Sequence, residues 1–268
     1  MTDAVLPGCE SYAAPGGPRG VLVLHGFTGN PSSMRPLAES LAARGHTVSL
    51  PRLPGHGTSV EDLMNTSWVD WSGAALEAYD ELAARCEDVA VVGLSMGGGL
   101  TALVAEERDP VACVFINPLV APPSAELRQG LADLIGAGLT TIDAIGSDIK
   151  REGSTELSYD ATPLECARSL FEGIEVVYEH LGDVRAPSLL LTSREDHVVT
   201  PDNGVALEER ATGPVTRVWL EDSYHVATLD NDQALVERLA AEFIAGVSRC
   251  AASRATRSPT SPTSRACA

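Results

Sequence analysis

The sequence predicts an α/β fold with a mostly parallel central sheet, flanked by helices and interrupted by one small helical insertion. Short and almost wholly apolar segments alternate along the chain with amphipathic ones, which is typical of repeated strand–helix units. The apolar segments carry few polar residues, as expected of parallel strands that helices cover on both faces. A chain of 268 residues is also long enough to bury such a core in one large domain.

The individual elements follow from these patterns in order along the chain. The clearest predicted strands are Val21–Leu24, Thr47–Leu50, Val89–Val92, Ala112–Ile116, Ser188–Thr192 and Val215–Leu220. Apolar residues at helical spacing predict helices at Arg35–Arg44, Trp68–Arg85, Leu100–Glu107 and Gln233–Val247.

The alternation stops once, after Asn117 and Pro118. About seventy residues separate this point from the next strand, which is far more than one helix and its loops require. Helical patterns inside this segment fall at Ala125–Ile135, Pro163–Gly173 and Val176–Leu181. We therefore expect a helical cap at residues 121–182, inserted into a core formed by residues 1–120 and 183–248.

Composition excludes several classes of partner. The formal net charge of -18 argues against binding to nucleic acid or to an anionic membrane surface, because both require clustered cations. No apolar run approaches the ~18 residues needed to cross a bilayer, and the N-terminus lacks a signal-peptide pattern. These features predict a cytoplasmic protein. The final residues, 249–268, are rich in Ser, Thr, Pro and Arg and are expected to be disordered.

No metal, disulfide or cofactor site is predicted. The six cysteines are scattered without CxxC spacing, and Cys113 lies in an apolar run typical of a buried thiol. Motifs for zinc, for a phosphate-binding loop and for a dinucleotide fold are missing from the sequence.

The strongest chemical signal is Gly93-Leu94-Ser95-Met96-Gly97, a G-x-S-x-G directly after a predicted strand and before a helix. A serine on such a sharp turn has a strained backbone, and glycines two residues away on each side remove side chains that would clash. The turn also places Ser95 at a helix N-terminus, where free N–H groups stabilise an oxyanion. Ser95 is therefore the predicted nucleophile.

A second glycine-containing loop, His25-Gly26-Phe27-Thr28-Gly29, follows the first predicted strand. In a fold of this type, such a loop contributes one backbone N–H to an oxyanion hole, and the residue after the nucleophile contributes the other. We assign these donors to Phe27 and Met96. His25 is expected to make structural hydrogen bonds.

A serine nucleophile needs a base, and the base needs an acid that holds its tautomer. Of the six histidines, only His225 lies just past a strand end and late enough in the chain. Asp196 follows the preceding strand, so the order is Ser95, Asp196, His225. The rival acids are Glu195 and, less favourably placed, Asp222 and Asp230.

Four motifs together resemble the α/β-hydrolase superfamily, and within it the small bacterial monoacylglycerol lipases. They are Leu24 to Gly29, Gly93 to Gly98, Glu195 to Val199 and Ser223-Tyr224-His225-Val226-Ala227-Thr228-Leu229-Asp230. The last of these motifs, together with a further cap segment from Ile145 to Lys150, is more specific to the monoacylglycerol lipases than the others. Related bacterial carboxylesterases share much of the first two motifs. The similarity runs from about residue 20 to about residue 246.

The resemblance implies an enzyme that cleaves a monoacylglycerol to glycerol and a fatty acid. It also implies that Glu156 contacts the glycerol head group and that Ile145 lies among the apolar residues around the acyl chain. A general carboxylesterase for short acyl chains is the alternative on the same machinery, and a non-catalytic ligand receptor on this fold is the alternative of a different class. An apolar cap surface would serve either a homodimer or contact with lipid aggregates, and composition does not choose between them.

Overall fold

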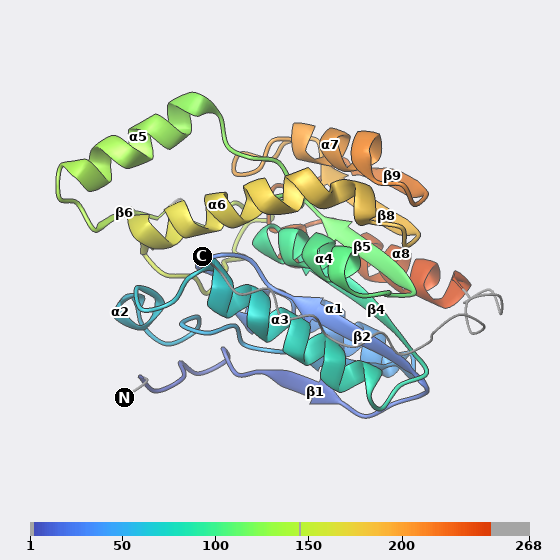
Figure 1. The fold of residues 1–268 in the computed structure, drawn as a ribbon. Coiled ribbons are helices and arrows are strands. Elements are labelled where there is room, and N and C mark those ends of the chain that lie inside the picture. The colour runs from blue at the N-terminus through green and yellow to red at the C-terminus, as the bar shows by residue number, and fades with distance from the viewer. Residues whose placement is uncertain (1–2, 145, 248–268) are drawn as a thin grey trace, which may run out of the picture.

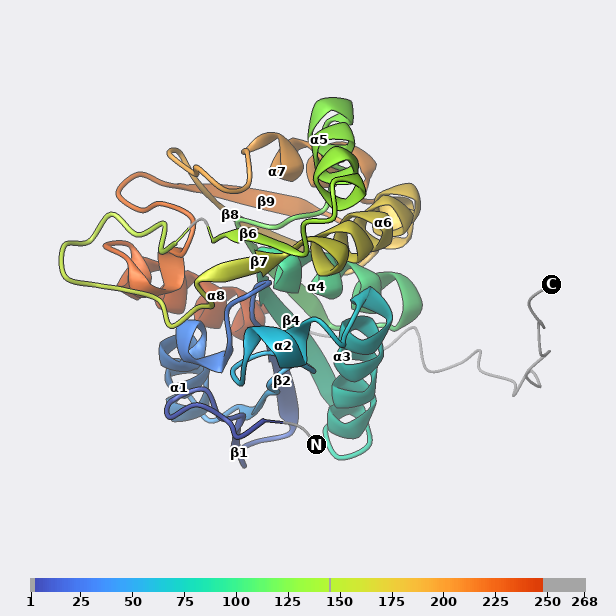
Figure 2. The same ribbon diagram turned by 90° about the vertical axis from the view of Figure 1, so that its left-hand side faces the viewer.

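The computed structural model describes residues 3–144 and 146–247, and it contains a central sheet covered by helices on both faces (Figures 1 and 2). The strand order is β1-β3-β2-β4-β5-β8-β9. All neighbouring strands are parallel except β1, which pairs antiparallel with β3. This arrangement confirms the predicted fold class. The strands are β1 (Tyr12–Ala14), β2 (Arg19–Leu24), β3 (Thr47–Leu50), β4 (Asp88–Leu94), β5 (Ala112–Ile116), β8 (Ser188–Ser193) and β9 (Val215–Leu220).

Helices follow the strands in the expected rhythm. They are α1 (Arg35–Ala43), α2 (Val60–Leu63), α3 (Trp68–Ala83), α4 (Met96–Glu107), α5 (Ala125–Gly136), α6 (Leu164–His180), α7 (Asp202–Arg210) and α8 (Gln233–Gly246). Short 3₁₀ turns lie at Pro31–Ser33, Leu181–Asp183 and Ala227–Leu229. In the part of the chain that the structure describes, no helix is long and apolar enough to cross a membrane.

The two faces of the sheet bury separate apolar clusters. Along β2, Leu22 and Leu24 pack into the cluster that also holds residues of α3, α4 and α6. Val21 and Val23 point the other way, into the cluster formed with α1 and α8. Successive side chains of a strand alternate between faces, so a strand buried on both sides must be apolar throughout.

The segment between β5 and β8 contains α5, a short antiparallel pair and α6. The pair is β6 (Thr141–Asp143) with β7 (Ala161–Pro163). Helix α6 packs against α3 and α4, whereas α5 contacts α6 and projects beyond the rest of the molecule (Figures 1 and 2). The predicted tail at residues 249–268 lies outside the described residues.

One sequence-based boundary is wrong. Pro163–Gly173 and Val176–Leu181 were expected as separate helices, but they form the single helix α6. Gly173 lies inside the helix and allows close packing there, since a Cβ added to it would lie 2.2 Å from the Cγ of Trp68. The glycine lets α6 approach the start of α3.

The last turn of α4 contains a half-buried acid, Glu106, with an unusual proton affinity. Burial, and then the negative charges of Asp183 and Glu107, raise the pKa of Glu106 to about 8. Its Oε1 is buried and has no hydrogen-bond partner among the described residues. The folded protein therefore keeps a proton on Glu106 between its ordinary pKa and pH 8, whereas the unfolded chain releases it.

We expect the free energy of unfolding to fall as the pH rises through this window, because the unfolded state binds fewer protons than the folded state. Between pH 6 and pH 8.5, the wild-type protein should lose roughly 1 to 2 kcal/mol more than Glu106→Gln, an amount reduced by the partial exposure of this carboxyl. Urea denaturation of both proteins at the two pH values measures the difference. Parallel losses in both proteins would show that Glu106 is not the group responsible.

Candidate active site

Ser95 lies on a strained turn between β4 and α4. Its backbone has φ 58° and ψ −121°, a conformation that non-glycine residues rarely adopt. A Cβ added to Gly97 would lie 2.2 Å from the carbonyl oxygen of Leu24, and one added to Gly93 would lie 1.9 Å from that of Gly97. Glycine is therefore required at both positions, as the sequence motif predicted.

The expected oxyanion loop lies directly beside this turn. Strands β2 and β4 are parallel neighbours with Leu24 opposite Gly93, so the loop after β2 meets the turn after β4. A Cβ added to Gly26 would be 3.4 Å from the Cβ of Ser95. Met96 is the first residue of α4, so its N–H has no acceptor one turn earlier in the helix. The Phe27 and Met96 N–H groups thus lie on the two segments that flank Ser95.

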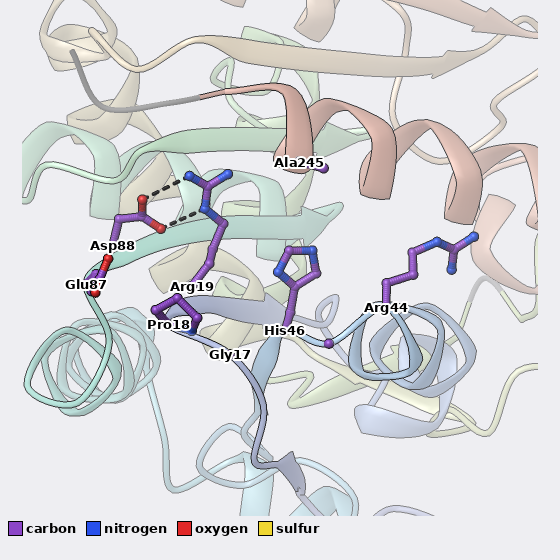
Figure 3. A pocket seen from close by; sticks show the side chains of 9 residues that line it. Gly17, Pro18, Arg19, Arg44, His46, Glu87, Asp88 and Ala245 are labelled. Atoms are coloured by element: carbon purple, nitrogen blue, oxygen red, sulfur yellow. Dashed lines mark hydrogen bonds and ion pairs between the residues drawn. The ribbon is translucent and has the colours of Figure 1, made fainter.

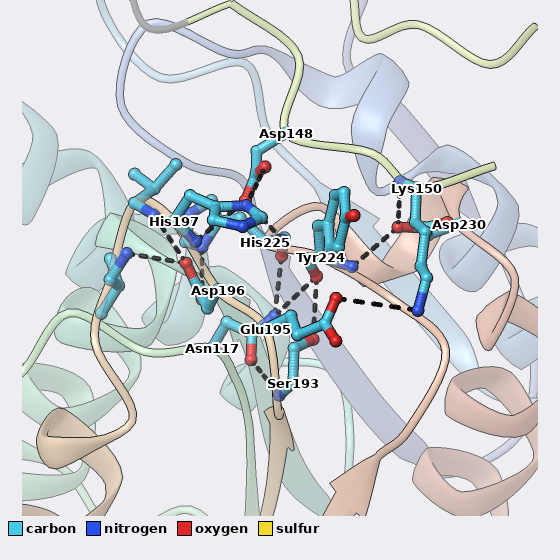
Figure 4. Close-up of polar contacts among 12 residues, drawn as sticks. Asn117, Asp148, Lys150, Ser193, Glu195, Asp196, His197, Tyr224, His225 and Asp230 are labelled. Carbon is cyan, nitrogen blue, oxygen red and sulfur yellow. Dashed lines mark hydrogen bonds and ion pairs between the residues drawn. The ribbon is translucent and has the colours of Figure 1, made fainter. Parts of the chain in front are cut away.

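His225 and Asp196 form a buried pair at the same edge of the sheet (Figure 4). The His225 Nδ1 lies 2.8 Å from the Asp196 Oδ2, and the two side chains are 8% and 1% exposed. The other oxygen of Asp196 accepts hydrogen bonds from the N–H groups of Val198 at 2.9 Å and Val199 at 2.8 Å. The loop after β8 therefore fixes the carboxylate, and the carboxylate orients the imidazole.

The rival acids are engaged elsewhere. Glu195 and Asp222 both face the ammonium of Lys150, at 3.8 and 3.1 Å. Asp230 is fully buried and accepts hydrogen bonds from backbone N–H groups, including that of Tyr224 at 2.8 Å. Of the four candidates, only Asp196 is hydrogen-bonded to His225.

Asn117 connects the end of β5 to the end of β8 and to the loop after β9, a role that the sequence did not predict. Its Nδ2 donates to the carbonyl oxygen of His225 at 2.8 Å, and its Oδ1 accepts from the N–H of Ser193 at 2.8 Å. The positive φ of 41° at Asn117 marks a sharp turn at the end of β5. Asparagine tolerates this conformation better than most residues, which is the only signal that the sequence offered.

The end of strand β5 also holds the backbone of Ser95. The Ser95 N–H donates to the carbonyl oxygen of Ile116 at 3.1 Å. Within the described residues, no hydrogen bond joins the Ser95 hydroxyl to His225. Such contacts are often long without substrate and shorten in the complex.

His25 has the structural role expected of it. Its Nδ1 donates to the carbonyl oxygen of Gly26 at 2.9 Å, and its Nε2 accepts from the N–H of Leu53 at 3.1 Å. Complete burial lowers the pKa of His25 to about 4, so the ring is neutral at pH 7. His25 therefore joins the expected oxyanion loop to Leu53 from inside the core.

Glu156 lies against the expected oxyanion loop, although the sequence places it far from every predicted strand end. A Cβ added to Gly29 would lie 2.8 Å from the Glu156 Oε1. Burial raises the pKa of this carboxyl, while the nearby charge of His225 and a hydrogen bond with Ser33 lower it. Glu156 is thus close to both the loop and the predicted base. Ile145, the other residue suggested by resemblance, lies outside the described residues.

A pocket of about 370 Å³ lies at the opposite edge of the sheet (Figure 3). Arg19 and Asp88 line it, and these residues begin β2 and β4, whereas the Ser95 turn follows the end of β4. Their bidentate ion pair, with contacts of 2.7 and 2.9 Å, joins the two strands. In parallel sheets, ligand sites form at the carboxyl ends of the strands, so this pocket is not part of the candidate site.

Comparison with known proteins agrees with this geometry. A family model described as "Alpha/beta hydrolase family" matches residues 21–238. The chain is 42% identical to the thermostable monoacylglycerol lipase of Bacillus sp. (strain H-257), over 90% of this chain and 96% of that protein. It is 28% identical to a carboxylesterase of Bacillus subtilis (strain 168), over 88% and 96% of the two chains.

A solved structure from a study of the metagenome-derived lipolytic enzymes LipS and LipT is 41% identical. The match covers 90% of this chain and 99% of the chain in that structure, with a TM-score of 0.86. Together with the serine turn, the flanking N–H groups and the buried Asp–His pair, these matches show that the chain belongs to the α/β-hydrolase family.

Proposed function

We propose that this protein is a serine hydrolase that cleaves monoacylglycerols to glycerol and a free fatty acid. The observation that carries the proposal is the His225–Asp196 hydrogen bond of 2.8 Å at the same sheet edge as the strained Ser95 turn. The proposed substrate class is supported by the 42% identical relative from Bacillus, which is a monoacylglycerol lipase. A cytoplasmic location remains a prediction from the sequence, and the choice between a homodimer and contact with lipid aggregates stays open.

In the proposed mechanism, Ser95 attacks the ester carbonyl carbon while His225 accepts the hydroxyl proton on Nε2. The carbonyl electrons move onto oxygen, and the N–H groups of Phe27 and Met96 stabilise that oxyanion. Collapse of the intermediate breaks the bond to the glycerol oxygen, which leaves with the proton from His225. Asp196 holds the imidazole and stabilises its charged form throughout.

A water molecule completes the cycle by the same steps. His225 removes a proton from the water, which attacks the acyl-enzyme carbonyl. The bond to the Ser95 oxygen then breaks, and the serine recovers its proton from His225. The products are glycerol and a fatty acid, and the enzyme returns to its starting state.

We propose that residues 121–182 form a cap over the acyl chain. Its apolar side chains from α5 and α6, including Leu131 and Leu164, form one cluster. Phe27 of the oxyanion loop packs against this cluster and against the core. An acyl chain bound between cap and core would therefore lead directly to the reacting carbonyl.

An acyl-length series separates this function from the carboxylesterase alternative. We expect rates on p-nitrophenyl esters to persist from four-carbon to twelve-carbon acyl groups, because a long apolar channel gains binding energy with each methylene. A steep fall beyond short chains would instead favour a general carboxylesterase.

Glu156 is proposed to bind the glycerol head group through its carboxylate. Glu156→Gln should lower kcat/KM for 1-monolauroylglycerol about tenfold, because charged hydrogen bonds to the glycerol hydroxyls are lost. The matched control substrate is p-nitrophenyl laurate, which has the same acyl chain and no glycerol, and its kcat/KM should change less than about twofold. Equal losses on both substrates, or none on either, would contradict a head-group role.

A further inference from the structure

The insertion approaches the core closely at residues 146–154, next to the loops that follow β8 and β9 (Figure 4). The N–H groups of Lys150 and Arg151 both donate to the buried carboxylate of Asp230, each at 2.8 Å. Ser154 donates its hydroxyl to the carbonyl oxygen of Leu229 at 2.9 Å. Hydrogen bonds thus connect this segment to the residues that follow His225.

Asp148 is the member of this segment that reaches the Asp–His pair. Its Oδ2 accepts hydrogen bonds from the backbone N–H of His225 at 3.1 Å and from that of His197 at 3.2 Å. Its Oδ1 lies 2.8 Å from the Nδ1 of His197, and its side chain is only 12% exposed. The carbonyl oxygen of Asp148 also accepts from the N–H of Val226 at 3.1 Å.

These contacts join the two loops on which the proposed chemistry depends. His225 is the proposed base, and His197 directly follows Asp196, the residue that orients this base. The carboxylate of Asp148 accepts from the backbones of both loops and so fixes the distance between them. This link is separate from the 2.8 Å hydrogen bond between Asp196 and His225. The charged and titratable groups near His225 include Asp196 and His197 from the β8 loop, and Asp148 and Glu156 from the insertion.

We propose that Asp148 is a positioning residue, which holds the backbone of His225 and the Asp196 loop in the geometry needed for proton transfer. This inference rests on the proposed function of Ser95, Asp196 and His225. A displacement of about 1 Å in a catalytic group lowers turnover by up to about a hundredfold, so loss of the bridge should reduce kcat without weakening substrate binding.

The test compares Asp148→Ala with Asp143→Ala, a change at an exposed aspartate of β6 in the same insertion. Each protein is labelled to completion with a fluorophosphonate, which reacts with the active serine and counts competent sites. The kcat and KM for p-nitrophenyl butyrate are then expressed per labelled site. We expect Asp148→Ala to lose about 30-fold in kcat with KM within about twofold, and Asp143→Ala to match the wild type.

Two further variants sharpen the test. Asp148→Asn keeps one acceptor oxygen, so it should lose less than alanine does, and it serves as the test variant if Asp148→Ala does not fold. His197→Ala removes the side-chain partner of Asp148 but leaves the His225 contact, so kcat should fall less than about threefold. An equal loss in His197→Ala and Asp148→Ala would overturn the proposal, because Asp148 would then act through His197.

The outcome for the labelled fraction separates positioning from stability. A lower labelled fraction with kcat per labelled site within twofold of the wild type would overturn the proposal, since Asp148 would only stabilise the fold. If the wild-type protein neither labels nor hydrolyses the ester, the proposed function itself fails. An active wild type with an equally active Asp148→Ala leaves that function intact and refutes only the role of Asp148.

Discussion

Replacing Ser95 with alanine is expected to lower kcat on ester substrates by about a million-fold, to the background rate. The hydroxyl is the only group on the strained turn that can form the acyl-enzyme, and the flanking N–H groups cannot replace a nucleophile. Initial rates with p-nitrophenyl laurate measure the loss over the widest accessible range. The change removes one oxygen from a half-buried residue, so the melting temperature should stay close to that of the wild type.

Ser72→Ala is the matched control, because Ser72 lies on α3 and its hydroxyl donates to the carbonyl oxygen of Val69, at 3.2 Å. Its activity should equal that of the wild type. A Ser95→Ala protein that keeps more than about a thousandth of the wild-type rate would contradict the role of Ser95 as nucleophile.

Replacing Asp196 with asparagine is expected to lower kcat about ten-thousand-fold. Asp196 accepts the Nδ1 proton of His225 at 2.8 Å, which leaves Nε2 free to take the proton of Ser95. Its other oxygen is already bound to the N–H groups of Val198 and Val199, so an asparagine amide oxygen would take that place. The amide NH₂ would then face Nδ1 and favour the wrong tautomer of the imidazole.

Glu195→Gln provides the control for this variant. The two acids are adjacent in sequence, but Glu195 is exposed and pairs with Lys150 at 3.8 Å. Its replacement should change kcat by less than about threefold, as is usual for a surface ion pair. A large loss for Glu195→Gln, together with a near-normal Asp196→Asn, would move the acid role to Glu195.

The parts of the site that sequence predicts well are those encoded locally. Gly93 is required by a contact within the turn itself and Gly97 by a contact with Leu24 of the neighbouring strand β2, and the G-x-S-x-G motif after a strand predicts both glycines. Asp196 and His225 each follow a recognisable apolar strand. Since parallel strands end at one edge of the sheet, three residues far apart in sequence could be expected to meet there.

The remaining parts depend on tertiary packing that no local pattern encodes. Glu156 reaches Gly29 only because the insertion folds back over the core, and Asp148 bridges two loops for the same reason. The need for glycine at position 173 within α6 depends on the ring of Trp68, about a hundred residues earlier. Helix α7 was missed because its sequence is mostly polar, with Leu207 as its one fully buried large apolar side chain in the described residues.

Short edge elements were also missed, for a different physical reason. Strand β1 has only three residues and a half-exposed pattern, so it lacks the apolar run of the central strands. It pairs antiparallel with β3 through backbone hydrogen bonds, which almost any sequence can supply. Length and burial together therefore explain which strands could be expected from the sequence.

The most direct test of the proposed function measures fatty-acid release from 1-monolauroylglycerol, with dilaurin and trilaurin in parallel, for the wild type and Ser95→Ala. We predict rapid release from the monoglyceride, much slower release from the other two, and no release above background by Ser95→Ala. Release that is absent from the monoglyceride, or that persists in Ser95→Ala, would contradict monoacylglycerol hydrolysis by an acyl-enzyme on Ser95.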